Sequence, residues 1–161
     1  MKNNRYIINS AKRTLARELS SIKNLKSTFN TNFCKAVSLI YNTKGKVVIT
    51  GVGKSAIIGK KIVATMNSTG SPAIFMHAAE ALHGDLGIVQ NDDVIIVISK
   101  SGNTQEIKQL VPFLKTTGVK LISITSEKNS FLAINSDFFI NSFIEKEACP
   151  NNLAPTPSTT A

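Results

Sequence analysis

Three hydroxyl side chains and a glycine stand within six residues of one another, at Ser99, Ser101, Gly102 and Thr104. An apolar run precedes them and a helical pattern of apolar residues follows, so we expect them at a helix N-terminus. Hydroxyl groups and unpaired backbone N–H groups at such a position can bind a phosphate group without a metal ion. An ordinary helix cap is the other interpretation. Because three hydroxyls exceed what a cap needs, the pattern favours a phosphate site.

A second turn contains Gly53, Lys54 and Ser55, between a β-branched run at residues 47–49 and a helical pattern over residues 56–68. A strand, a glycine turn and a helix in this order bring the backbone close to a ligand. They also direct the positive end of the helix dipole toward it. Lys54 would add a full positive charge. A tight turn without a ligand is the alternative interpretation, but the pattern favours an anion site.

Two familiar phosphate-binding loops do not fit this second turn. The Walker A loop needs a glycine five residues before Gly53, where the chain has Val48. The dinucleotide fingerprint that would start at Gly51 needs its third glycine where the chain has Ala56. Both motifs are therefore excluded.

Histidines and glutamates that could transfer a proton stand near the same turns. His77 and His83 lack a third ligand at a recognised spacing, so they are a weak metal site, and His83 fits proton transfer or hydroxyl binding better. Glu106 is either an acid that suits the helix dipole or a carboxylate directed into a cleft. Glu145 and Glu147 follow the last predicted strand, as site carboxylates or as a surface charge cluster.

The elements that must position these residues alternate between strands and helices. Helices are expected over residues 4–26 and 32–45, and strands at residues 47–49, 73–76, 94–98, 120–125 and 138–140. This order predicts an α/β fold, a doubly wound, five-stranded parallel sheet with N-terminal helices. Ligands bind beyond the carboxyl ends of the strands in such sheets. We expect the candidate residues there, with Gly70 and Ser71 beside the second strand.

Composition and charge narrow the class of protein. The chain has 161 residues, which suits one domain with a real core, and its net charge is +9. Residues 1–46 hold ten Lys and Arg against the single acid Glu18, whereas the remainder holds nine of each sign. Such a basic segment suits nucleic-acid binding, a solvated helix face or a subunit interface. Few aromatic residues interleave the charges, so nucleic-acid binding is the least favoured.

The first predicted helix carries an apolar stripe that recurs at three- and four-residue steps from Ile7 to Leu25. A stripe of that length indicates an interface, and we expect a homo-oligomer. No apolar run is long enough for a membrane span, and no signal peptide is visible. Cys34 and Cys149 form neither a metal spacing nor a disulfide framework, so a reducing cytoplasm is expected.

Five stretches carry a resemblance to a known family. They read Gly-Val-Gly-Lys-Ser at 51–55, His-Ala-Ala-Glu-Ala-Leu-His-Gly-Asp-Leu-Gly at 77–87, Ser-Lys-Ser-Gly-Asn-Thr-Gln-Glu at 99–106, Glu-Lys-Glu-Ala-Cys-Pro at 145–150 and Leu-Ala-Pro-Thr-Pro-Ser-Thr-Thr-Ala at 153–161. Together they resemble the flavodoxin-like sugar isomerase (SIS) domain, and within it the D-arabinose-5-phosphate isomerase family. The second and fourth stretches are more specific than the Ser-x-Ser-Gly turn, which is common to the wider SIS superfamily.

The resemblance implies an activity and residue roles. The family interconverts D-ribulose 5-phosphate and D-arabinose 5-phosphate through an enediol, requires no metal, and supplies Kdo for lipopolysaccharide or capsule. Lys54, His83, Glu106 and Glu147 match positions implicated in catalysis or substrate binding, and His77 matches a position where inhibitory zinc can bind. The resemblance also implies a tetramer. The candidate substrate-binding residues are Gly53, Ser55, Gly70, Ser71, His83, Ser99, Ser101, Gly102, Thr104 and Glu145.

The chemistry of the family agrees with these residue types. Moving a proton between carbons next to a carbonyl needs a base and stabilisation of the enediolate oxygen. Glu147 or Glu106 could be the base and Lys54 the stabiliser. A non-catalytic module that senses sugar phosphates is an alternative, although such modules tend to lack the carboxylates at Glu145 and Glu147. An interaction module that uses its basic helix is another.

The chain also departs from the family pattern. Asn103 stands where an acid is common and Pro157 where serine is common. The sequence stops at Ala161, before a helix and a Ser-His-Pro-Gly-Gly-like segment whose histidine is implicated in catalysis. From the resemblance we also expect no cystathionine-β-synthase-type regulatory domains within residues 1–161. We therefore expect one SIS domain, with helices over residues 1–45 and a C-terminally incomplete core over residues 46–161.

Overall fold

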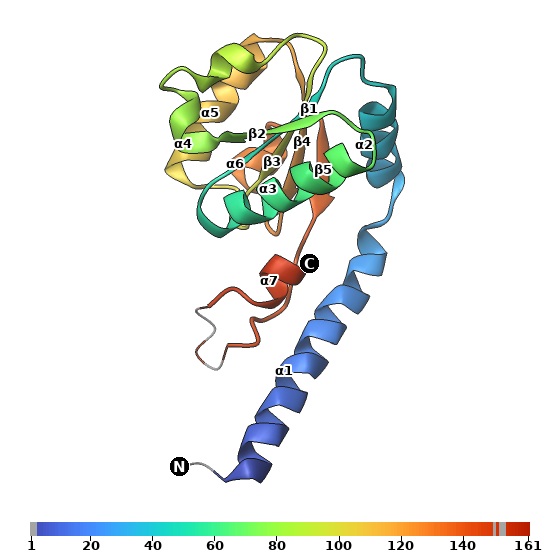
Figure 1. The fold of residues 1–161 in the computed structure, drawn as a ribbon, viewed down its shortest axis with the longest axis vertical. Helices are drawn as coiled ribbons and strands as arrows, with labels where there is room; N and C mark the ends of the chain where they lie inside the picture. The colour runs from blue at the N-terminus through green and yellow to red at the C-terminus, as the bar shows by residue number, and fades with distance from the viewer. Residues whose placement is uncertain (1–2, 150, 152–153) are drawn as a thin grey trace.

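The computed structural model describes residues 3–149, 151 and 154–161; Pro150 and Leu153, which belong to two of the resembling stretches, lie outside this part. Its centre is a five-stranded parallel sheet in the order β2-β1-β3-β4-β5 (Figure 1). The strands are β1 (Val47–Gly51), β2 (Ala73–His77), β3 (Val94–Ile98), β4 (Lys120–Thr125) and β5 (Phe138–Asn141). The predicted doubly wound α/β sheet is confirmed.

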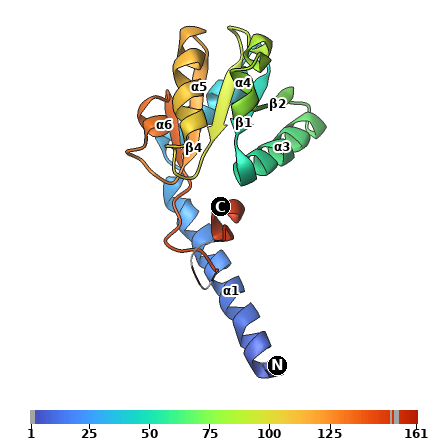
Figure 2. The same ribbon diagram turned by 90° about the vertical axis from the view of Figure 1, so that its left-hand side faces the viewer.

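Helices cover both faces of this sheet (Figures 1 and 2). The α-helices are α1 (Asn4–Asn24), α2 (Thr31–Asn42), α3 (Gly53–Ser68), α4 (Ala78–Ala81), α5 (Gln105–Thr116), α6 (Phe131–Ile134) and α7 (Pro157–Thr160). Two 3₁₀ helices are η1 (Leu25–Thr28) and η2 (Asp85–Ile88). Within the described part of the chain, no helix combines the length and apolar character that a membrane crossing needs.

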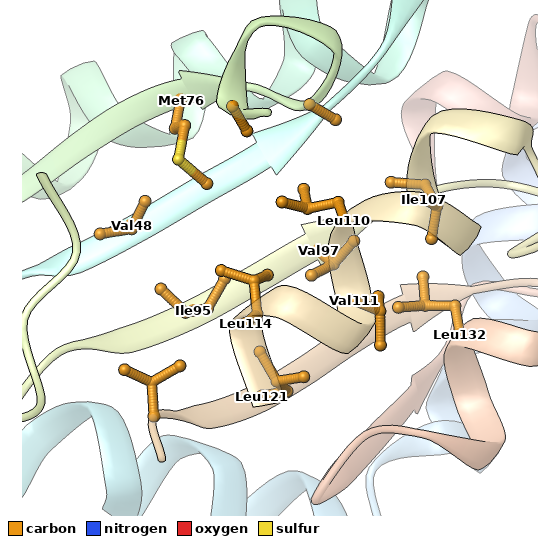
Figure 3. Packing of buried hydrophobic residues seen from close by; sticks show 13 residues of the cluster. Val48, Met76, Ile95, Val97, Ile107, Leu110, Val111, Leu114, Leu121 and Leu132 are labelled. Carbon is orange, nitrogen blue, oxygen red and sulfur yellow. The ribbon is translucent and has the colours of Figure 1, made fainter. Parts of the chain in front are cut away.

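The core lies on both faces of the sheet because successive strand residues point in opposite directions. In β1, Val48 joins a cluster with α4, α5 and α6, whereas Ile49 joins a cluster with α2 and α3. Figure 3 shows the first cluster, where Leu110 and Leu114 of α5 lie over Val97 and Ile95 of β3. A sheet that is buried on both faces gives the loops at its edge a rigid support.

The strand order creates a switch point beside β1. The chain passes from β1 to β2 on one side of β1, and then crosses to β3 on the other side. The helix after β1 is α3 and the helix after β3 is α5, and these two cover opposite faces of the sheet. Ligands bind at such a point in open α/β sheets, at the carboxyl ends of the strands. Both predicted anion-binding turns lie there.

Two helix starts differ from the prediction. Helix α2 begins at Thr31 instead of residue 32, because the side chain of Asn30 caps it by accepting hydrogen bonds from the backbone N–H groups of Asn32 and Phe33 at 2.8 and 3.3 Å. Helix α3 begins at Gly53 instead of near residue 56, since the turn glycine leads directly into the first helical turn. The anion-binding turn is therefore itself the N-terminus of α3.

Helix α1 extends away from the α/β core (Figures 1 and 2). The short helix α7 of the C-terminal segment contacts both α1 and α3. Apolar side chains on α1 are exposed, including Ile8 at 53%, Leu15 at 60% and Leu19 at 59%. The described part of the chain therefore leaves the predicted stripe uncovered over much of its length.

Candidate active site

A cavity of about 360 Å³ lies at the switch point between β1 and β3. Four of its lining hydroxyls were predicted as phosphate ligands: Ser55, Ser99, Ser101 and Thr104. Ser55 lies in the first turn of α3, and the other three lie in the loop between β3 and α5. The structure thus brings the two predicted turns together. We call this cavity the cradle.

The loop between β3 and α5 is shaped by Gly102. Its N–H donates to the carbonyl and to Oγ of Ser99, at 3.1 and 3.2 Å. Its φ is 62°, a conformation that side chains disfavour. A Cβ at this position would also collide with the side chain of Ser130. Glycine is therefore needed for the loop to adopt the form that lines the cradle.

Thr104 decides between the two interpretations of this loop. It occupies the N-cap position of α5, yet its side chain makes no capping hydrogen bond. Its Oγ1 is buried and has no hydrogen-bond partner in the structure. A buried hydroxyl without a partner is costly and needs an explanation, such as a ligand that it contacts. The geometry favours a binding role over a cap.

A smaller cavity of about 160 Å³ adjoins the cradle, because Ser55 and Lys100 line both. Lys54, which is exposed in the first turn of α3, lines this second cavity. Ser158, which belongs to the C-terminal segment, also lines this second cavity. Two ammonium groups therefore stand beside the hydroxyls, as an anionic ligand requires.

Glu147 is a buried carboxylate next to these lysines. Nζ of Lys100 lies 2.6 Å from its Oε1, and the backbone N–H groups of Thr156 and Ser158 donate to its Oε2 at 2.7 and 3.4 Å. Burial alone would raise the pKa of Glu147, but the hydrogen bonds from Lys100, Ser158 and Thr156 outweigh it and lower the pKa to about 2. While paired in this way, Glu147 is ionised and a weak base.

A known protein family matches most of this chain. Residues 39–161 match the family described as SIS domain. The chain belongs to the SIS domain family. The resemblance seen in the sequence is thereby confirmed, and with it the flavodoxin-like arrangement of the sheet.

Relatives of this SIS domain include two curated proteins. Arabinose 5-phosphate isomerase KpsF of Escherichia coli O6:H1 is 47% identical over 156 residues, and arabinose 5-phosphate isomerase KdsD of Francisella tularensis is 48% identical over 157 residues. Each match covers 96% of this chain but 48% of the relative, so the chain spans about half the length of these curated relatives. The solved structure of Escherichia coli CFT073 c3406 in complex with arabinose 5-phosphate is 42% identical and has a TM-score of 0.93, covering 99% of this chain and 85% of that one.

The histidines and Glu106 lie around the SIS site but line neither cavity. His77 ends β2, and its Nδ1 accepts a hydrogen bond from Ala79 N–H at 3.3 Å. His83 is exposed after α4, and Glu106 is half-buried in the first turn of α5. In the described part of the chain, no group of three His, Cys, Asp or Glu side chains could hold a metal ion together.

Three predicted substrate-binding residues lie away from the cradle. Gly70 and Ser71 precede β2, so they stand at the amino edge of the parallel sheet, in a hollow shared with Tyr41. Glu145 is exposed and lines another hollow with Arg17 of α1. All three lie near strands, as predicted. Gly70 and Ser71, however, are at the amino end of their strand, and Glu145 faces α1 and not the cradle.

Lys100 is the site residue that sequence reasoning missed. A lysine between two serines has the local pattern of an ordinary solvated side chain. The structure shows it lining both cavities and paired with Glu147. Its position inside a predicted phosphate turn, in a chain with few acids, was the signal that could have found it.

Proposed function

We propose that this SIS domain is an aldose–ketose isomerase that interconverts D-ribulose 5-phosphate and D-arabinose 5-phosphate and supplies Kdo synthesis. The observation that carries the proposal is the cradle, with the unpartnered hydroxyl of Thr104 at the N-terminus of α5. The names of the relatives KpsF and KdsD support the substrate. So does the arabinose 5-phosphate that is bound in the solved relative.

The reaction moves protons and leaves the overall oxidation state of the sugar unchanged. A carboxylate removes the proton from C2 of the aldose, and the electron pair of that C–H bond forms a C1–C2 double bond as O1 becomes an oxyanion. O1 then gains a proton and the O2 hydroxyl loses its proton. O2 becomes the carbonyl oxygen of the ketose as a proton adds to C1. Such a sequence needs a base and positive charge near the enediolate oxygens.

Two carboxylates are candidates for the base. Glu147 is buried against Lys100, which also lines the cradle, and Glu106 is half-buried two residues after Thr104. We assign the base to Glu147, because Lys100 and Ser158, which hold its carboxylate, line the cavity beside the cradle, where the sugar carbons of a ligand with its phosphate in the cradle would lie. Lys54 stabilises the enediolate or the phosphate, and His83 binds a sugar hydroxyl.

We propose no metal requirement, because a carboxylate and an ammonium group can supply both the base and the charge that the reaction needs. The inhibitory zinc site at His77 stays a prediction. Its Nδ1 is engaged with Ala79 N–H, so Nε2 is the atom that would bind the metal.

The partner that we propose for α1 is a second copy of this chain. The exposed stripe of Ile8, Leu15 and Leu19 gives a long apolar surface of the kind that becomes buried in oligomers. We propose a tetramer that acts in the cytoplasm without a nucleic-acid or membrane partner.

Turnover by the purified protein tests the proposed activity. We expect D-ribulose 5-phosphate to be converted to D-arabinose 5-phosphate, followed by proton NMR. Lys54→Ala should damage both binding and turnover, because its charge acts on the ligand in both states. Lys61→Ala, at an exposed lysine further along α3, is the matched control. Calorimetric binding of the sugar phosphate without any conversion would instead favour a non-catalytic sensing module.

A further inference from the structure

Lys100 has a backbone that is held by hydrogen bonds and a side chain that is half exposed. Its carbonyl accepts hydrogen bonds from Oγ1 of Thr125 and from Ser126 N–H, both at 3.0 Å. Its side chain, however, is 51% exposed and lines two adjoining cavities. The ammonium group can therefore change its contacts without a change in the loop that carries it.

The ammonium group of Lys100 supplies positive charge to the cradle. Its lining is made of hydroxyls, apolar groups and the acid Glu127, and Lys100 is the one cation among the described residues that line it. Hydroxyls and backbone N–H groups carry only partial charges, so a phosphate dianion in the cradle, close to a carboxylate, is better compensated when a full positive charge is present. Yet in the structure Lys100 is turned to Glu147.

The carboxylate of Glu147 is held by Lys100 and by the C-terminal segment. Its Oε2 accepts hydrogen bonds from the backbone N–H groups of Thr156 and Ser158, while Oε1 accepts from Lys100. The C-terminal segment thus fixes the carboxylate in place, and departure of the lysine would leave it fixed. Other charged groups nearby are Lys54, which lines the same cavity as Lys100, and Arg17, which donates to the Ala148 carbonyl at 3.3 Å.

We propose that the ligand phosphate and Glu147 compete for Lys100, so that binding of the phosphate in the cradle transfers the ammonium group from the carboxylate to the phosphate. This inference rests on the proposed function, and it explains how a tightly paired carboxylate becomes a base only when substrate is present. A buried carboxylate that loses its cation has a raised pKa, which suits proton abstraction at neutral pH. In the empty site Glu147 stays ionised and unreactive.

Phosphate affinity in four forms of the protein tests the competition. Calorimetry with inorganic phosphate is applied to the parent, Lys100→Met, Glu147→Gln and the double variant. Lys100→Met should weaken binding about 10-fold or more, as expected for loss of a charged hydrogen bond. Glu147→Gln should tighten binding about 3-fold or more, because the competitor is gone. The double variant should match Lys100→Met, and it keeps the test valid if loss of the ion pair with Glu147 unfolds the single variant.

Lys108→Met is the matched control, since Lys108 is an exposed lysine on α5 outside both cavities. It should bind phosphate as the parent does. Parent-like affinity in Lys100→Met or in Glu147→Gln would overturn the competition while leaving the isomerase proposal intact. Failure of the parent to bind any phosphate would overturn both.

Release of the carboxylate is tested by carbon-13 NMR of the Glu147 side chain, whose signal is identified by its loss in Glu147→Gln. Saturating phosphate should raise the titration midpoint of this carboxyl by about one pH unit or more. In Lys100→Met the midpoint should be high with and without phosphate. A midpoint in the parent that phosphate does not change would overturn the proposal.

Discussion

At the scale of single residues, the Thr104 hydroxyl separates binding from folding. Because this buried hydroxyl has no partner, Thr104→Val should not lower the melting temperature. The same change should weaken sugar-phosphate binding by about 1.5–3 kcal/mol, the usual contribution of a hydrogen bond to a charged group. Calorimetry and thermal unfolding measure the two effects. Thr116→Val, at the exposed end of the same helix, should leave binding unchanged. Unchanged binding by Thr104→Val would show that this hydroxyl does not contact the ligand.

Glu147 also makes a pH-dependent contribution to stability. Its pKa falls from 4.5 to about 2 on folding, so the unfolded chain takes up the proton first as the pH falls below 4.5. The stabilisation is fully present above that pH and is lost as the pH falls through about 2. The shift corresponds to about 3 kcal/mol at most, because Lys100 is half exposed and the pair is partly screened.

Urea unfolding of the parent and of Glu147→Gln measures this contribution. The measurements run from about pH 6 to about pH 3, which lie on either side of the pKa of a glutamate in the unfolded chain. The parent should lose stability more steeply toward acid, and the difference between the two proteins should shrink as the pH falls. Asp93 and Asp137 also have lowered pKa values, but they are present in both proteins. A difference that is constant with pH would contradict the linkage.

At the scale of elements, two glycines shape the turns of the site under different constraints: Gly53 is the first residue of α3, and Gly102 lies in the loop before α5. Gly102 and Gly53 both have positive φ, at 62° and 56°. A Cβ at Gly102 would collide with Ser130, whereas one at Gly53 would meet nothing within 4 Å. Gly53→Ala should cost about 1–2 kcal/mol of stability, and Gly102→Ala clearly more. Chemical unfolding measures the two losses of stability, and calorimetry shows whether each variant still binds phosphate. Equal losses of stability would show that the collision with Ser130 does not destabilise Gly102→Ala.

The sequence predicted the five strands, because each is a run of apolar or β-branched residues. It predicted that they are parallel, because helical patterns separate one strand from the next. It also predicted Ser55 and the Ser99–Thr104 turn at one edge. It could not place Gly70 and Ser71, since proximity to a strand does not say which end a residue reaches. It also missed the contact of Lys100 with Glu147, because no local pattern links residues 47 positions apart.

At the scale of the whole molecule, α1 is the feature that the single chain does not explain. We expect the parent to be a homo-oligomer that buries the stripe containing Leu15 and Leu19. The double change Leu15→Glu and Leu19→Glu should produce a monomer whose α/β core stays folded, measured by light scattering and circular dichroism. The double change Lys12→Glu and Lys23→Glu, at exposed basic positions of the same helix, controls for added negative charge. A parent that is monomeric would contradict this assignment.

The central claim, that this SIS domain abstracts a proton next to a sugar carbonyl, is tested most directly by hydrogen exchange with solvent. D-arabinose 5-phosphate is incubated with the protein in deuterated water, and loss of the C2 proton signal is followed by NMR. The parent should exchange this proton, and Glu147→Gln should slow exchange by about 10²–10⁴ while sugar-phosphate binding persists. Parent-like exchange in Glu147→Gln together with loss in Glu106→Gln would assign the base to Glu106. A parent protein that binds the sugar phosphate but never exchanges the C2 proton would contradict the account.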